Sequence, residues 1–141
     1  MKKSCSVILL CLVLLLCLPG IPAFAQEEKI DLDLTMMSET MVYGIMFDVI
    51  ASPERYVGQR MRLPGEYEGF KDAVTGEVEH TIIFFDSSGC CEVDMNFTLD
   101  ETYVYPQDYP RSGRKMTLVG VLSIVGEGKD AVCRIDGGTL E

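Results

Sequence analysis

The chain has 141 residues, with 22 acidic side chains against 12 basic ones and a formal net charge of −10. This length is enough for one domain with its own core and too short for two. An acidic surface repels phosphate backbones and anionic lipid headgroups, so the charge argues against nucleic acid and against membrane surfaces as partners.

Residues 1–25 have the pattern of a cleavable signal peptide. A basic pair precedes an apolar run, and Ala23-Phe24-Ala25 places small residues at both positions that a signal peptidase reads. The run is shorter than the roughly 20 residues that cross a bilayer as a helix. We therefore expect an extracytoplasmic protein, secreted, periplasmic or associated with the cell envelope, with no stable membrane span after cleavage. Retention of the segment as an anchor is the alternative.

Cleavage changes both the charge and the cysteine count. Removing two of the 12 basic residues leaves 10 against 22 acidic ones, a net charge of −12. Three of the six cysteines leave with the signal, and Cys90, Cys91 and Cys133 remain. In an oxidising compartment an odd count indicates one disulfide plus a free thiol, an intermolecular bond, or a site that uses all three.

The remaining chain begins with a polar segment, 26–36, which we expect to be a flexible leader. A helical pattern follows, capped by Thr35 or Ser38 and ended by Pro53. Its apolar positions recur every four residues and predict a stripe that faces the core. They are Met37, Met41, Ile45 and Val49.

After the helix the apolar period changes to two, which is typical of strands. Gly65 and Gly69 lie inside the first strand, where glycine marks a bulge or a sharp bend. A proline-bearing loop, 103–114, separates the third strand from the fourth and lacks a helical pattern. The predicted strands are 60–70, 78–86, 91–99, 116–125 and 131–136.

These elements predict a mainly β domain over residues 37–141. Five strands with bent, glycine-containing interiors and a long connection between the third and fourth suggest an OB-fold, a small antiparallel Greek-key barrel, here with an N-terminal helix. An α+β meander packed on that helix is the alternative.

The segment from Ser52 to Gly65, SPERYVGQRMRLPG, follows the predicted helix and opens the first strand. With the Cys90-Cys91 pair at the start of the third strand, it resembles small exported bacterial OB-fold-like families of unknown function. The similarity covers most of residues 37–141. It implies a fold and a compartment, and no activity.

The three remaining cysteines are the candidate site. Alternation along the strands points Cys91 and Cys133 inward, and the third and fifth strands of an OB barrel are neighbours, so a Cys91–Cys133 disulfide is one interpretation. A second is a metal site made by Cys90, Cys91 and Cys133, completed by His80 or an acid, because thiolates select zinc or cuprous copper. A third is thiol redox exchange through an exposed Cys90.

Catalytic motifs are missing from the sequence. It has a single histidine, no G-x-S-x-G and no phosphate-binding glycine loop, so we expect a protein that is not an enzyme.

Tyr103, Tyr105 and Tyr109 form an aromatic loop that could contact a glycan or a peptide. The leading hypothesis is an exported, non-enzymatic binding or accessory module for a protein partner or small ligand, with a thiophilic metal as one candidate. The alternative is a disulfide-stabilised structural domain.

Overall fold

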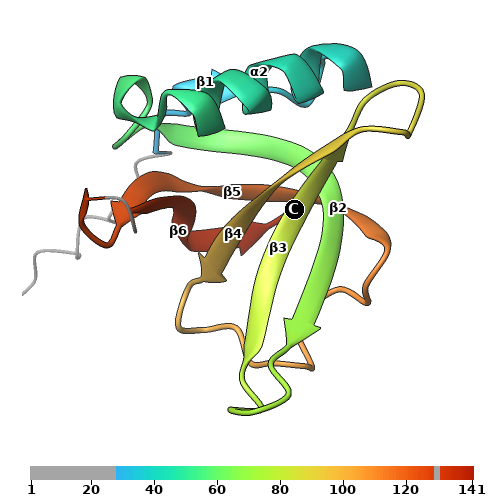
Figure 1. Ribbon diagram of the computed structural model, residues 1–141, viewed down its shortest axis with the longest axis vertical. Helices are drawn as coiled ribbons and strands as arrows, with labels where there is room; N and C mark the ends of the chain where they lie inside the picture. Colours follow the sequence, from blue (N-terminus) through green and yellow to red (C-terminus); the bar gives the residue numbers. More distant parts are fainter. Residues whose placement is uncertain (1–27, 129–130) are drawn as a thin grey trace, which may run out of the picture.

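A computed structural model describes residues 28–128 and 131–141 of the chain (Figure 1). The predicted signal peptide and its cleavage site lie outside the described residues. In the part that is described, no helix is long and apolar enough to cross a membrane.

The described residues form a closed five-stranded barrel with the OB-fold topology. Its strands are β2 (Arg60–Lys71), β3 (Val78–Phe85), β4 (Glu92–Leu99), β5 (Arg114–Val125) and β6 (Val132–Leu140). They pair in the order β2-β3-β4-β6-β5, and β5 pairs with β2 to close the sheet. The β4–β6 pairing is parallel and the other four barrel pairings are antiparallel. The predicted OB-fold is confirmed.

Alternating inward side chains fill the barrel. Met95 and Phe97 of β4 are 2% and 3% exposed, as the clean period of two predicts. Cys91 of the same pattern is exposed, because β4 begins only at Glu92 and the cysteine belongs to the preceding turn. The interior also holds fully buried side chains from the other strands. They are Met61, Leu63, Ile82, Phe84, Leu118, Leu122 and Ile135.

The helix α2 (Glu39–Ala51) lies across the end of the barrel where β3 ends and β4 begins (Figure 1). Ser38 caps it by accepting a hydrogen bond from the amide of Met41, as predicted, and the short helix η1 (Pro53–Arg55) follows. The buried face overlaps the expected stripe in part. Val49 is buried as predicted, and Met37 and Ile45 are partly buried against the core. Met41 is 55% exposed, and Val42 and Met46 complete the buried face.

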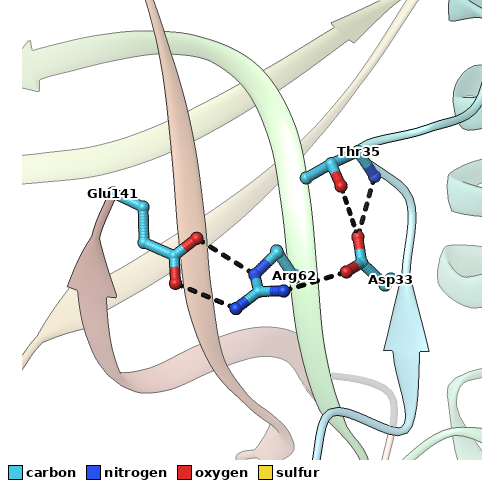
Figure 2. A network of polar contacts seen from close by, with 4 residues as sticks. All are labelled: Asp33, Thr35, Arg62 and Glu141. Carbon is cyan, nitrogen blue, oxygen red and sulfur yellow. Dashed lines mark hydrogen bonds and ion pairs between the residues drawn. The ribbon is translucent and has the colours of Figure 1, made fainter.

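Part of the expected leader belongs to the barrel. β1 (Leu32–Asp33) pairs in parallel with β2, and Leu34 is fully buried. Arg62 of β2 holds this segment through its ion pair to Asp33, and it also pairs with Glu141, which follows β6 (Figure 2). Asp33 accepts hydrogen bonds from Thr35 as well. The polar composition of 26–36 gave no sign of this pairing, because one buried leucine and ion pairs to residues distant in sequence hold the segment in place.

The β2–β3 and β4–β5 connections lie at the end of the barrel opposite α2 (Figure 1). Residues 100–113 form turns rather than the helix that OB-folds often carry there, as the prolines predicted. The two ends therefore differ in chemistry: the α2 end carries the β3–β4 turn with its cysteines, and the opposite end carries the tyrosine loop.

Candidate metal centre

The turn between β3 and β4, residues 86–91, holds the predicted cysteine pair in a compact loop. The amide of Asp86 donates to the carbonyl of Cys91 at 3.0 Å, and the amide of Gly89 donates to the carbonyl of Asp86 at 3.0 Å. Gly89 has a φ of 68°, in the left-handed region that glycine adopts without a steric penalty. The closed turn brings residues 86 and 90 together although they are four positions apart.

Three potential ligand groups meet in this turn. The Sγ atoms of Cys90 and Cys91 are 3.5 Å apart, and Cys90 Sγ is 3.9 Å from Oδ2 of Asp86. One donor atom from each of the three residues lies within 4.8 Å of the others. Two thiols and a carboxylate form a donor set suited to a thiophilic divalent ion.

The two carboxylate oxygens of Asp86 have different partners. Oδ1 accepts hydrogen bonds from the amides of Cys90 at 3.2 Å and Cys91 at 3.4 Å, whereas no amide of the described residues bonds to Oδ2. The Ser88 hydroxyl lies 2.8 Å from each oxygen and 3.0 Å from Cys90 Sγ. The Ser88 hydroxyl and the turn amides hold the pKa of Asp86 below its ordinary value. The carboxylate is therefore charged at neutral pH, and Oδ2 is turned toward the sulfur.

The neighbouring thiols influence each other. The hydrogen bond and the like charge of Cys90 raise the pKa of Cys91, so Cys91 stays protonated at neutral pH in the absence of a cation. A raised pKa works against the redox interpretation, because the thiolate is the attacking species in disulfide exchange. A bound cation would reverse the effect by stabilising both thiolates.

The predicted Cys91–Cys133 disulfide is not formed, and Cys133 does not join the cysteine pair. The strands β4 and β6 are neighbours, as predicted, but their parallel register aligns Asn96 with Arg134. This places Cys133 beside the strand position just before Asn96, about 13 Å along β4 from Cys91 at 3.3 Å per residue. Cys133 packs against the core, and burial raises the pKa of its thiol.

His80, the other predicted ligand, also lies away from the cysteines. It is near the start of β3, roughly 20 Å along the extended strand from Asp86. Its Nδ1 is 2.9 Å from the hydroxyl of Tyr67, and its ring centroid is 4.2 Å from that of Tyr109 and 5.1 Å from that of Tyr105. Burial lowers the pKa of His80. The histidine belongs to the aromatic cluster at the opposite end of the barrel.

The three tyrosines of the loop have different partners in the structure. Tyr105 and Tyr109 join the cluster of His80, in which burial raises the pKa of Tyr67 to about 12. Tyr103 instead accepts a hydrogen bond from the amide of Leu140 at 3.1 Å. The structure thus gives Tyr103 an internal role and leaves Tyr105, 48% exposed, as the accessible ring of the three.

Asp86 is the site residue that the sequence pattern did not name. An aspartate four residues before a cysteine, followed by two serines and a glycine, is the signature of a turn closed by its own side chain. That signal places the carboxylate near the cysteine amides. The sequence alone predicted three thiolates, from Cys90, Cys91 and Cys133, and left the completing ligand open between His80 and an unnamed acid.

Comparison with known proteins gives one structural similarity. No family model and no curated protein matches the chain. A crystal structure from Klebsiella pneumoniae, described as a "putative nucleic acid-binding lipoprotein", aligns with a TM-score of 0.46 at 12% identity, over 71% of this chain and 84% of that one. The resemblance to exported families of unknown function, drawn from Ser52–Gly65 and the cysteine pair, stays a prediction.

One expectation needs correction. The negative charge was taken to exclude nucleic acid as a partner, and the aligned structure, described as a "putative nucleic acid-binding lipoprotein", gives that exclusion no support. Net charge is a property of the whole surface, and it does not report the field at one face of a barrel. The exclusion of nucleic acid is therefore withdrawn.

Proposed function

We propose that this protein is an exported, non-enzymatic OB-fold module that binds a thiophilic metal ion in its β3–β4 turn. The observation that carries the proposal is the meeting of Cys90, Cys91 and Asp86 in one closed turn. Its supports are the distances between the donor atoms, the charge of the carboxylate and the exposure of the turn.

The donor spacing suits zinc. With Zn–S bonds of about 2.3 Å in a tetrahedron, two sulfurs stand about 3.8 Å apart, and a sulfur and a carboxylate oxygen about 3.6 Å apart. The corresponding separations are 3.5 Å between the two Sγ atoms and 3.9 Å between Cys90 Sγ and Asp86 Oδ2. These two separations are within a few tenths of an ångström of the expected values, and the donor atoms of Cys91 and Asp86 lie within 4.8 Å of each other. Rotation of the exposed side chains would complete the geometry.

Asp86 has two roles in this proposal. Oδ1 holds the turn through the amides of Cys90 and Cys91, while Oδ2 faces the ion. A ligand oriented by its second oxygen is already positioned before the metal arrives. The negative charges of Cys90 and Asp86 oppose deprotonation of Cys91, and a bound cation would offset this repulsion and stabilise the thiolates.

The exposure of the turn indicates exchangeable binding rather than structural support. Cys90 and Cys91 are both exposed, and three protein donors leave a tetrahedral ion one open position. Structural zinc sites use four protein ligands, so an open site is suited to accepting an ion and passing it on. The export signal predicted from residues 1–25 would place this exchange outside the cytoplasm.

Isothermal titration of the reduced protein with zinc, and separately with cuprous copper, tests the proposal. We expect one ion per chain and an affinity that rises with pH, because thiolates are the metal ligands and the ion must displace the proton of Cys91, whose pKa is raised. Cys91→Ser should weaken binding by at least about tenfold, and Asp86→Asn by a smaller factor, since the amide keeps the turn and loses the charge.

Cys133→Ser is the matched control. It removes one thiol that is packed against the core away from the turn, so its affinity should equal that of the wild-type protein. Metal binding that disappears with Cys133 and survives the loss of Cys91 would overturn the proposal. So would the absence of stoichiometric binding of either ion.

A further inference from the structure

A second site lies outside the cysteine turn, between the first turn of α2 and the central bend of β2. It is a cavity of about 390 Å³. Pockets of about 300–1,000 Å³ with apolar walls and a few polar groups are the usual sites for small molecules. The apolar part of its wall includes Val42, Pro64, Phe84 and Met116.

The polar network of Figure 2 fixes two residues of the cavity wall. Thr35 and Glu141 both line it, and both are tied to Arg62 of β2, Glu141 directly and Thr35 through Asp33. Arg62 contacts Glu141 through two nitrogens, at 3.0 and 3.1 Å. Bidentate pairs of this kind fix both partners in one orientation. Two chain segments that border the cavity are therefore positioned in advance.

The charge around the cavity is negative. Three of its lining residues are glutamates and one is a lysine. Glu39 pairs with Lys115 at 3.1 Å, and Glu141 shares Arg62 with Asp33. Among residues 28–128 and 131–141, no basic nitrogen lies within 4.0 Å of the Glu66 carboxylate. Lys115 lies opposite Glu66 in the β2–β5 pairing, but its ammonium is bonded to Glu39. In the described part of the chain, the Glu66 carboxylate is therefore the one on the cavity wall without an ion pair of its own.

We propose that this cavity binds a small organic cation with an apolar body, such as a hydrophobic primary amine. The apolar wall takes the body of the ligand, and Glu66 takes the ammonium group, because Glu39 is already paired with Lys115. An anion of the same shape would meet an excess of carboxylates and bind less well. None of the residues that line this cavity is a ligand of the proposed metal site.

Nuclear magnetic resonance titration of the whole protein with phenethylammonium tests the proposal, and phenylpropionate serves as the probe of similar shape and opposite charge. We expect saturable shifts of the amides of Gly65 and Thr117 with the cation, and several-fold weaker binding of the anion. Equal binding of the two probes, or no saturable shift with the cation, would overturn the proposal.

Glu66→Gln should weaken binding of phenethylammonium by about fivefold at low salt, the scale of one exposed ion pair. Glu68→Gln is the control, because it makes the same change of charge two residues along β2 and does not line the cavity. Both substitutions are outside the barrel core and should leave the spectrum of the free protein intact. Equal effects of the two substitutions would show a general charge effect and refute the assignment of Glu66.

Discussion

Replacing Gly120 with alanine should destabilise the barrel strongly. Gly120 is buried in β5 opposite Met61 of β2, at the irregularity in the β5–β6 pairing. A Cβ atom built there would stand 2.3 Å from Cγ2 of Ile135, and 3.2 Å from both the carbonyl oxygen of Asp136 and the Cα of Gly138. One core side chain and two backbone atoms of β6 occupy the space that the methyl group needs.

The magnitude follows from these distances. Ordinary carbon contacts are about 3.5–4.0 Å, so the methyl of Ile135 would have to move by more than an ångström in a close-packed core. Ile135 is fully buried, and the two neighbouring backbone atoms cannot move without disturbing the β5–β6 pairing. Overpacking of this kind costs about 2–3 kcal/mol. With a urea m-value of about 1.5 kcal/mol/M, the midpoint should fall by about 1.3–2 M.

Urea unfolding followed by far-ultraviolet circular dichroism measures the effect, and Gly44→Ala is the matched control. Gly44 lies in the middle of α2 with no atom within 4 Å of the added Cβ. Alanine there should stabilise the protein by about 0.5–1 kcal/mol, because it restricts the unfolded chain and favours the helix. The two glycine-to-alanine changes should therefore have opposite signs. A Gly120→Ala midpoint equal to or above that of the wild-type protein would refute the packing argument.

Three further predictions concern stability. Thr81→Val should cost about 1–2 kcal/mol in urea unfolding, because Thr81 is 2% exposed and donates to Oδ1 of Asn96 at 3.0 Å. Burial lowers the pKa of His80 from its usual 6.5, so the unfolded chain takes up the proton before the folded protein does. The free energy of unfolding should therefore fall as the pH drops from 7 through 6.5. His80→Gln should flatten this pH dependence, and an unchanged slope in the variant would contradict the role of His80. Dithiothreitol should leave the unfolding midpoint unchanged, since Cys91 and Cys133 are free; a disulfide between them would add about 3–4 kcal/mol, which reduction would remove.

Much of the fold could be predicted from the sequence, because it depends on local patterns. The period of two in β4 and the glycines in β2 indicated a small bent barrel, and Ser38 and Pro53 bounded the helix as predicted. The cysteine pair was found for a similar reason. Two adjacent thiols next to a glycine turn stay close to each other whatever the rest of the chain does.

The tertiary structure decided which residues join that pair. Cys133 was predicted within reach because β4 and β6 are neighbours, but pairing does not specify register, and the parallel offset moves it away. His80 is carried to the opposite end of the barrel by the length of β3. Asp86 joins the cysteines because the turn closes back on itself. The local sequence determines which groups meet within one turn, and Asp86 joins the cysteines through contacts inside residues 86–91. The register between strands depends on contacts between distant segments, and these contacts appear only when the chain is folded.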